Sequence, residues 1–224
     1  MKIVVRVGGS VVGSPINAPM INRYVTLLKD WKNQGHDVVA VVGGGSLARE
    51  FIKVAAYLGL EEEQRDWAAI HVSRLFAQLF VLGLGEAGCG AVPVCLDEAE
   101  ACLKKGKIVV MGGLRPGMTT DTVAALIGER IKADLLVKGS NVDGIYTKDP
   151  RKYPDAQKLD KLRFADLSNL FDEKQHKAGI NQIIDPEAVK ILAKIRLRTI
   201  VVDGYDTANL VYAVQDRHIG TVIE

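Results

Sequence analysis

The chain has 224 residues, which is long enough for one large α/β domain with a well-buried core or for two small ones. Its content of 48% apolar and 25% charged residues is ordinary for a soluble globular protein. The formal charge of +2 gives no electrostatic reason to expect nucleic acid as a partner. No uninterrupted apolar run reaches the roughly 18–20 residues of a membrane span, and the strand-like start does not resemble a secretion signal. We therefore expect a cytoplasmic protein with no membrane partner.

Apolar, β-branched runs that end in glycine or a turn read as strands. In chain order, the expected strands are Lys2–Val7, Asp37–Val42, Ala91–Val94, Lys107–Met111, Leu135–Val137 and Thr199–Val202. Their nearly continuous hydrophobicity is typical of a largely parallel sheet that is covered on both faces. The alternation of strands with helical patterns predicts an open α/β sheet with right-handed crossovers.

Helical patterns occur between these strands. Apolar residues recur at helical spacing at Leu47, Phe51, Val54 and Leu58, and a further helix is expected from about Asp66 into the early eighties. Asp185-Pro186 has the pattern of an N-cap followed by proline at the first helical position. By contrast, residues 147–177 are dense in charge and poor in strand formers, which predicts a solvated lobe over a site.

The three cysteines, Cys89, Cys95 and Cys102, are odd in number and form no CxxC pair. Such a set indicates neither a disulfide framework nor a zinc site. We therefore expect reduced, mostly buried thiols.

Glycine-containing turns follow four of the strand-like segments, at Gly8-Gly9-Ser10, Gly43-Gly44-Gly45-Ser46, Gly112-Gly113 and Gly139-Ser140-Asn141. In an open α/β sheet, ligands bind at the carboxyl ends of the strands, where these turns collect. Glycine lets bare N–H groups face a ligand, and a helix N-terminus favours phosphate oxygens. One such turn can simply start a helix, but four at one edge predict phosphate binding. The Walker, Rossmann and protein-kinase signatures are missing, so a different arrangement must hold the phosphates.

The segments VRVGGSV, VVGGGSLAREF, GGLRPGMTTDTVAALIGE and KGSNVDGIYTKDPRKYPDA resemble the amino acid kinase superfamily in their order and spacing. The resemblance extends over essentially the whole chain and is greatest to the archaeal type of uridylate (UMP) kinase. It implies a single domain, residues 1–224, folded as a three-layer α/β/α sandwich, with residues 1–130 binding the acceptor and 131–224 binding ATP. It also implies transfer of the ATP γ-phosphoryl group to UMP, the use of Mg²⁺, and a homohexamer.

The resemblance also assigns site residues. Those implied to bind ATP are Gly9, Ser10, Gly45, Arg49, Ser140, Asn141, Tyr146 and Asp149. Those implied to bind UMP are Gly44, Asp66, Leu114, Arg115, Pro116, Gly117, Met118, Thr119 and Thr120. The catalytic candidates are Lys138, Asp121 and Arg6, and Mg²⁺ is expected on the nucleotide phosphates rather than on protein carboxylates.

The chemistry of these residues suits phosphoryl transfer, which needs charge neutralisation and in-line positioning more than covalent chemistry. Arg49 is four residues beyond Gly45, where a guanidinium can reach phosphate, and Lys138 ends a buried strand. Asp121 is a candidate for orienting cationic groups, since a UMP phosphate oxygen is already ionised. The structural alternative is that Thr119, Thr120 or Asp121 only caps the helix that follows.

The chain departs from the family pattern at three places. Arg6 stands where many members have lysine, Met118 where close relatives often have histidine, and Leu114-Arg115 where small or polar residues are usual. The last two departures lie in the expected acceptor pocket. They leave the identity of the acceptor open.

Two alternative functions therefore remain. One is another small-molecule kinase of the same fold, of the isopentenyl phosphate or acetylglutamate type. Isopentenyl phosphate kinases have a histidine shortly after the triple glycine, where this chain has Ala48 and Arg49. The other is a non-catalytic nucleotide-binding protein similar to the molybdenum storage proteins, which the match of Lys138, Asp121 and Arg49 to catalytic relatives disfavours.

The helix that contains AAIHVSRLFAQLFVL has more apolar surface than one core face requires. In the family, subunits pair through helices in this part of the chain, and the dimers build a hexamer. The resemblance thus implies an interface here, while burial of this helix on both sides within one subunit is the structural alternative.

Overall fold

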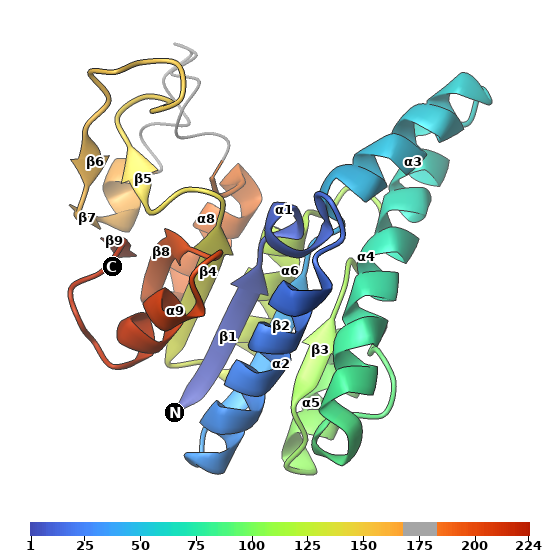
Figure 1. The fold of residues 1–224 in the computed structure, drawn as a ribbon, viewed down its shortest axis with the longest axis horizontal. Helices are drawn as coiled ribbons and strands as arrows, with labels where there is room; N and C mark the ends of the chain where they lie inside the picture. Colours follow the sequence, from blue (N-terminus) through green and yellow to red (C-terminus); the bar gives the residue numbers. More distant parts are fainter. Residues whose placement is uncertain (168–182) are drawn as a thin grey trace.

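The computed structural model describes residues 1–167 and 183–224, and a seven-stranded sheet forms its centre (Figure 1). The strand order is β3-β2-β1-β4-β8-β9-β7. Neighbours from β3 to β8 run parallel, β9 is antiparallel to β8, and β7 is parallel to β9. The strands are β1 (Lys2–Val7), β2 (Asp37–Val42), β3 (Val109–Met111), β4 (Leu135–Ser140), β7 (Lys161–Leu162), β8 (Thr199–Asp203) and β9 (Thr221–Ile223). A separate antiparallel pair consists of β5 (Ile145–Tyr146) and β6 (Lys158–Leu159).

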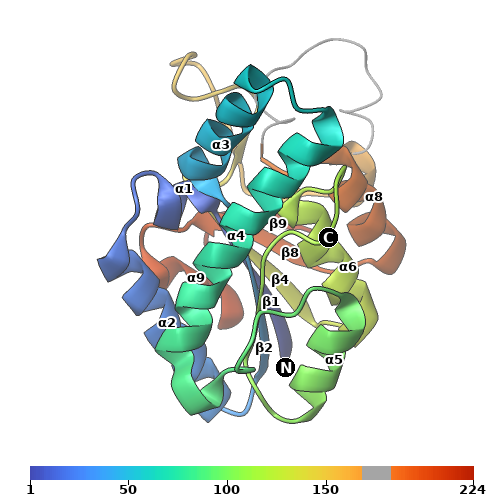
Figure 2. The ribbon, with the colours of Figure 1, turned by 90° about the vertical axis from the view of Figure 1, so that its right-hand side faces the viewer.

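Helices cover both faces of this sheet, so the molecule has three layers (Figures 1 and 2). One face carries α1 (Gly9–Gly13), α2 (Ala18–Asn33), α4 (Glu62–Leu84) and α9 (Thr207–Val214). The other carries α5 (Leu96–Lys104), α6 (Thr120–Ile131) and α8 (Pro186–Ile195). The helix α3 (Gly45–Tyr57) packs along the start of α4, and the short helix η1 (Gly85–Ala87) follows α4.

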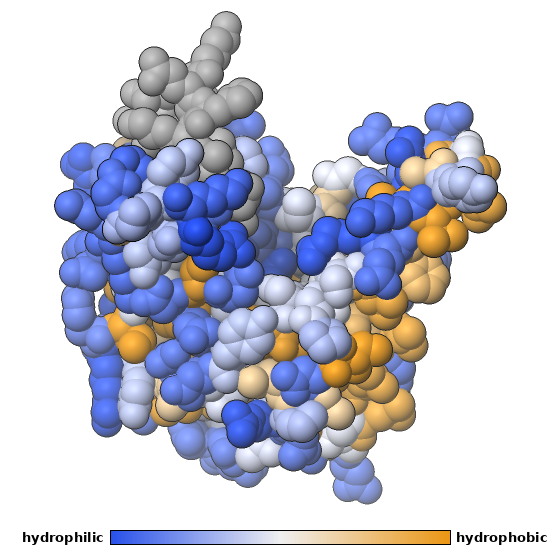
Figure 3. Space-filling model, turned by 45° about the horizontal axis from the view of Figure 1, so that its top comes forward, coloured by the Kyte–Doolittle hydropathy of each residue, from blue (hydrophilic) through white to orange (hydrophobic). Residues whose placement is uncertain are grey.

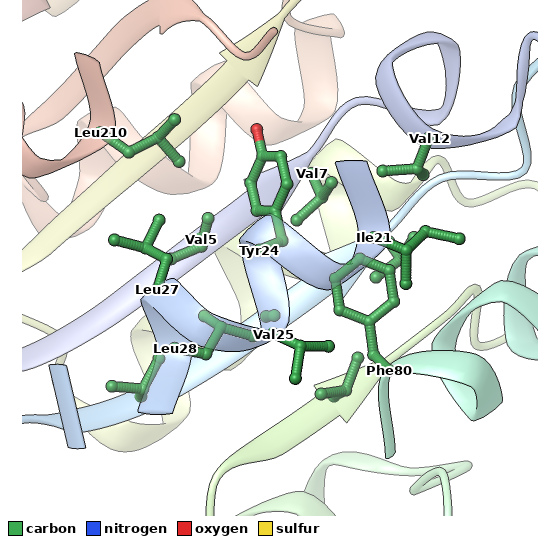
Figure 4. Packing of buried hydrophobic residues seen from close by; sticks show 14 of the residues in the cluster. Val5, Val7, Val12, Ile21, Tyr24, Val25, Leu27, Leu28, Phe80 and Leu210 are labelled. Carbon is green, nitrogen blue, oxygen red and sulfur yellow. The ribbon is translucent and has the colours of Figure 1, made fainter. Parts of the chain in front are cut away.

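The β-branched strands supply both hydrophobic cores, because successive side chains point to opposite faces of a sheet. In β1, Val5 and Val7 join the core under α2, whereas Val4 joins the core under α6. The first core is closed by large side chains such as Tyr24 and Phe80 (Figure 4). The predicted α/β/α fold with a largely parallel sheet is therefore confirmed.

Individual elements differ from the sequence-based expectations in several places. The expected strand Ala91–Val94 was wrong, since this segment has no regular structure. Proline lacks the N–H that a ladder needs, Pro93 interrupts the run, and Gly90 has a φ of 80°. The strand expected from Lys107 begins at Val109. The expected strands Leu135–Val137 and Thr199–Val202 extend to Ser140 and Asp203. The elements that were not predicted are α1, α2, α5, α9, β5, β6, β7 and β9.

The expectation of reduced cysteines was also wrong for one pair. Cys89 and Cys102 form a disulfide, with Cα atoms 5.8 Å apart, while Cys95 is free and exposed. Folding places Cys102 of α5 beside the segment that follows η1, where Gly88 bridges to Ile108. The number and spacing of the cysteines could not show that Cys89 and Cys102 lie close together in the fold.

Helix α4 with its following turn, Glu62–Ala87, is long and apolar enough to cross a bilayer by length and composition alone. Its buried side chains, however, pack against the sheet and α2, as in the core helix of a globular domain. The opposite side of this helix and the adjoining face of α3 expose large apolar residues. They gather on the right of Figure 3 and include Phe51, Val54, Leu58, Leu75, Leu79 and Leu82.

Candidate active site

A cavity of about 500 Å³ lies at the carboxyl ends of β1, β2 and β4, where the glycine turns collect. The starts of α1 and α3 form one wall and residues 146–151 the other, and Figure 3 shows this upper edge hollowed. Its lining includes all eight residues assigned to ATP and all three catalytic candidates. The lining residues are Arg6, Gly8, Gly9, Ser10, Gly43, Gly44, Gly45, Arg49, Thr120, Asp121, Lys138, Ser140, Asn141, Val142, Tyr146, Lys148, Asp149, Pro150, Arg151 and Ile183.

Two of the glycine turns are pressed against each other. A Cβ on Gly9 would overlap the backbone nitrogen of Gly45, and a Cβ on Gly45 would overlap the carbonyl oxygen of Gly9. Gly45 also has a φ of 62°, in the left-handed region that favours glycine. Glycine is therefore required here so that the starts of α1 and α3 can lie side by side on the cavity wall.

Three ionisable side chains meet at the floor of the cavity. Arg6 of β1 and Lys138 of β4 are partners in the parallel ladder, so both side chains project toward α6. Arg6 Nε lies 2.7 Å from Asp121 Oδ1, and Lys138 Nζ donates to Asp121 Oδ2. Arg6 also donates from Nη2 to the hydroxyl of Thr120 at 2.9 Å. The first turn of α6 thus supplies a carboxylate that holds two cations in place.

The electrostatics of this trio leave one positive charge in surplus. Burial raises the pKa of Asp121, but the charges of Arg6 and Lys138 outweigh burial and hold it below its usual value. Burial lowers the pKa of Lys138 to about 8, against the attraction of Asp121 and with the help of the nearby Arg6. Only 6% of the Lys138 side chain is exposed. A buried surplus of positive charge next to a cavity favours an anionic ligand such as phosphate.

The opposite wall comes from the charged lobe predicted for residues 147–177, of which 168–177 lie outside the described residues. Asp149 Oδ1 accepts from the backbone N and Nε of Arg151, and these hydrogen bonds lower the pKa of Asp149. The hydroxyl of Tyr146 donates to Asp143 at 2.7 Å, which raises the pKa of Tyr146 to about 12. Tyr146 thus lines the cavity, and its hydroxyl is held by a carboxylate.

A second cavity of about 160 Å³ adjoins the first, since Gly44 and Thr120 line both. Its lining brings together residues assigned to the acceptor: Gly44, Asp66, Met118, Thr119 and Thr120, beside Ala48, Ala69, Ile70, Ser73 and Gly113. Thr119 caps α6 by accepting from the N–H groups of Asp121 and Thr122, as the structural reading expects. Its hydroxyl also donates to Asp185 at 2.5 Å.

The remaining residues assigned to the acceptor lie farther out. Arg115, Pro116 and Gly117 line a wide, open cavity of about 700 Å³ together with Asp66, Trp67 and two glutamates of α4. Asp66 lines both outer cavities, and its Oδ2 accepts from the backbone N–H of Gly117 at 2.8 Å. Leu114 instead packs against the core beneath α6.

Within residues 1–167 and 183–224, no three His, Cys, Asp or Glu side chains form a group that could hold a metal ion. The cations of the site, by contrast, suit phosphate oxygens. Arg6, Arg49 and Lys138 in the cavity lining therefore fit nucleotide phosphates, which would carry Mg²⁺.

Residues 1–203 match the sequence profile described as the amino acid kinase family. The chain belongs to this family. A uridylate kinase of Methanocaldococcus jannaschii is 44% identical over 206 residues, which cover 91% of each chain. A uridylate kinase of Methanobrevibacter smithii is 37% identical over 223 residues, which cover 100% of this chain and 99% of the relative. The crystal structure of uridylate kinase from Archaeoglobus fulgidus superposes with a TM-score of 0.88 at 37% identity, covering 100% of both chains.

Several residues of this amino acid kinase site were not singled out from the sequence. Lys148 and Arg151 line the large cavity, and the charged run around Asp149 could have indicated them. Asp185 was predicted only as an N-cap, but besides accepting from Ala188 N it accepts from the hydroxyls of Thr119 and Thr122. That second role depends on the packing of α8 against α6, for which no local pattern exists.

Proposed function

We propose that this chain transfers the γ-phosphoryl group of ATP to UMP, giving ADP and UDP. The observation that carries the proposal is the junction of the two cavities at Gly44 and Thr120, directly beside Arg6 and Lys138. Two phosphate-bearing ligands can meet end to end there, with cations placed where the charge of the transferred group develops. The uridylate kinases at 37–44% identity support UMP as the acceptor.

The large cavity receives ATP. We assign its phosphates to the turns that contain Gly9, Ser10 and Gly45 and to Arg49, and its nucleoside to Ser140, Asn141, Tyr146 and Asp149. Mg²⁺ bound to the ATP phosphates would neutralise charge and polarise the γ-phosphoryl group. Within a single domain, roughly residues 1–130 bind the acceptor and also supply the turns that hold the ATP phosphates, and roughly residues 131–224 bind the rest of ATP.

The second cavity receives UMP. Its phosphate lies at Gly44 and Thr120, and the nucleoside extends toward Asp66 and the segment 114–119. Asp121 acts as a positioning residue and not as a base, because the attacking phosphate oxygen is already ionised. Lys138 and Arg6, held by that carboxylate, stabilise the negative charge on the transferred group.

A panel of acceptors tests this proposal against the other kinases of the fold. A coupled ADP-release assay compares UMP, CMP, dTMP, isopentenyl phosphate, carbamate and acetylglutamate at equal concentration. We expect kcat/KM for UMP to exceed that of every other acceptor by at least roughly 100-fold, or about 2.7 kcal/mol. A preference for isopentenyl phosphate or acetylglutamate, or no ADP release with any acceptor, would contradict the proposal.

Assembly and location belong to the same proposal: a cytoplasmic homohexamer built from dimers. The apolar faces of α3 and α4 support the dimer, because exposed clusters of this kind mark interaction sites. We expect Val54→Glu to weaken assembly in light scattering, because Val54 is 59% exposed within that cluster. The matched control is Val94→Glu, a valine 48% exposed in the segment before α5. A wild-type monomer at dilute concentration would overturn the assembly.

A further inference from the structure

Helix α4 holds the beginning of the acceptor segment through one arginine. Arg74 donates from Nε to the carbonyl oxygen of Gly113 and from Nη2 to that of Leu114, both at 2.9 Å. These carbonyls belong to the first residues after β3, from which the segment 114–119 extends over the acceptor cavities. The guanidinium fork thereby fixes two successive peptide planes.

The hydrogen-bond acceptors of Arg74 are neutral carbonyl groups. Arg74 is partly buried, and burial lowers its pKa by more than the charge of Glu98 raises it. Among the described residues, no carboxylate lies within ion-pair distance of Arg74, whereas the exposed Arg130 pairs with Asp97 and Glu100. The Trp67 ring lies 5.7 Å from the Arg74 guanidinium carbon and offers a cation–π contact. A guanidinium desolvated to bind neutral carbonyls indicates that the conformation of this backbone matters.

Neighbouring contacts show that the same backbone is seated tightly on α4. The hydroxyl of Ser73 accepts from Gly113 N at 2.8 Å and donates to Ile70 O at 2.7 Å. A Cβ on Gly112 would lie 2.7 Å from the backbone nitrogen of Arg74, so only glycine allows this approach. The segment is held again at its far end, where Gly117 N donates to Asp66.

We propose that Arg74 is a positioning residue that sets the conformation of segment 114–119 and through it the affinity for the acceptor nucleotide. The inference deepens the proposed function and rests on it. Two parallel hydrogen bonds to adjacent carbonyls need the planar fork of arginine, which the ammonium of lysine cannot reproduce. Gly113, which Arg74 holds, lines the acceptor cavity, whereas the lining of the cavity assigned to ATP includes neither Gly113 nor Leu114. Loss of Arg74 should therefore affect the two substrates unequally.

Steady-state kinetics of Arg74→Met test this inequality, because methionine keeps most of the apolar packing and removes both hydrogen bonds. We expect KM for UMP to rise at least tenfold, KM for ATP to stay within twofold, and Arg74→Lys to fall between wild type and Arg74→Met. Arg130→Met is the matched control, since Arg130 also donates two side-chain hydrogen bonds, but at the C-terminal end of α6. Its KM values should both be unchanged.

Hydrogen exchange of the nucleotide-free protein supplies a second readout that does not depend on the acceptor. Amides of residues 113–118 should exchange at least tenfold faster in Arg74→Met than in wild type, and no faster in Arg130→Met. Unchanged exchange, or a KM for ATP that rises in parallel with that for UMP, would overturn the positioning role. A wild-type enzyme that does not phosphorylate UMP would instead defeat the proposed function, while the exchange result would still decide the role of Arg74.

Discussion

Replacing Lys138 with methionine should stabilise the fold and abolish phosphoryl transfer. Arg6 and Lys138 share the single carboxylate of Asp121, so the buried trio carries a surplus positive charge. Because the folded-state pKa of Lys138 is lowered from 10.5 to about 8, the unfolded chain binds more protons between these values. The unfavourable contribution of Lys138 to folding is therefore fully present below pH 8 and is lost as the pH rises toward 10.5.

The pKa difference gives the size of this effect. At about 1.36 kcal/mol for each pKa unit, a fall from 10.5 to about 8 corresponds to roughly 3 kcal/mol of folding free energy. Methionine has a similar volume and leaves Arg6 and Asp121 as a balanced pair. Since the loss of the Lys138–Asp121 hydrogen bond offsets part of the gain, we expect Lys138→Met to be more stable by about 1–3 kcal/mol at pH 7. By about pH 9 the gain should have fallen to roughly half.

Urea unfolding of the wild type and of Lys138→Met at pH 7 and pH 9 measures the gain in stability. Steady-state assays measure the loss of kcat, which we expect to be at least roughly 100-fold. Lys104→Met is the control, because Lys104 makes an exposed ion pair within one helix, and its removal should change stability by less than about 0.5 kcal/mol. A Lys138→Met protein that unfolds at lower urea than wild type at pH 7 would refute the surplus-charge argument. A gain of equal size at pH 9 would refute its link to the titration of Lys138.

Substitutions at three further positions probe the same site. Arg6→Ala should lower kcat at least roughly tenfold in steady-state assays, and Arg6→Lys should recover part of that loss. A lower melting temperature of Arg6→Ala with an unchanged kcat would show that the role of Arg6 is purely structural. Gly44→Val should abolish activity in a folded protein, because a Cβ on Gly44 would lie 2.5 Å from the Ala48 Cβ and intrude at the junction of the cavities. Turnover at the wild-type rate would show that this turn is not part of the site. Asp185→Ala should lower the free energy of unfolding by about 0.5–2 kcal/mol in urea, because α8 loses its N-cap. KM for UMP should also rise, because the Thr119 hydroxyl loses its hydrogen-bond partner. An unchanged KM would show that Asp185 only caps α8.

The long strands could be predicted from the sequence because their own residues determine them. The runs Lys2–Val7 and Asp37–Val42 are rich in β-branched residues and largely buried on both faces, and the observed strands match them residue for residue. Strand β9 has three residues and depends on pairing with β8, so its local pattern carries little information. The Asp185 N-cap was confirmed, because its signal lies within four adjacent residues.

The site could be predicted in outline, because parallel topology alone brings the strand ends to one edge. Gly9 and Gly45 line the cavity as expected, but the structure adds a second reason for glycine at these positions. A Cβ on either residue would overlap the backbone of the other. Helical spacing at Phe51 and Val54 predicted an apolar face correctly but could not indicate that the fold leaves it exposed. Arg74 has no signal in its neighbourhood, because its partners lie 39 and 40 residues away.

Transfer of label from ATP to UMP shows directly whether the two cavities that meet beside Arg6 and Lys138 carry out phosphoryl transfer. With γ-³²P-labelled ATP, UMP and Mg²⁺, we expect label in the β-phosphate of UDP in step with ADP formation. Lys138→Met, although folded, should produce neither. Release of label as inorganic phosphate without labelled UDP, or label transfer at an equal rate in Lys138→Met, would contradict phosphoryl transfer to UMP at this site.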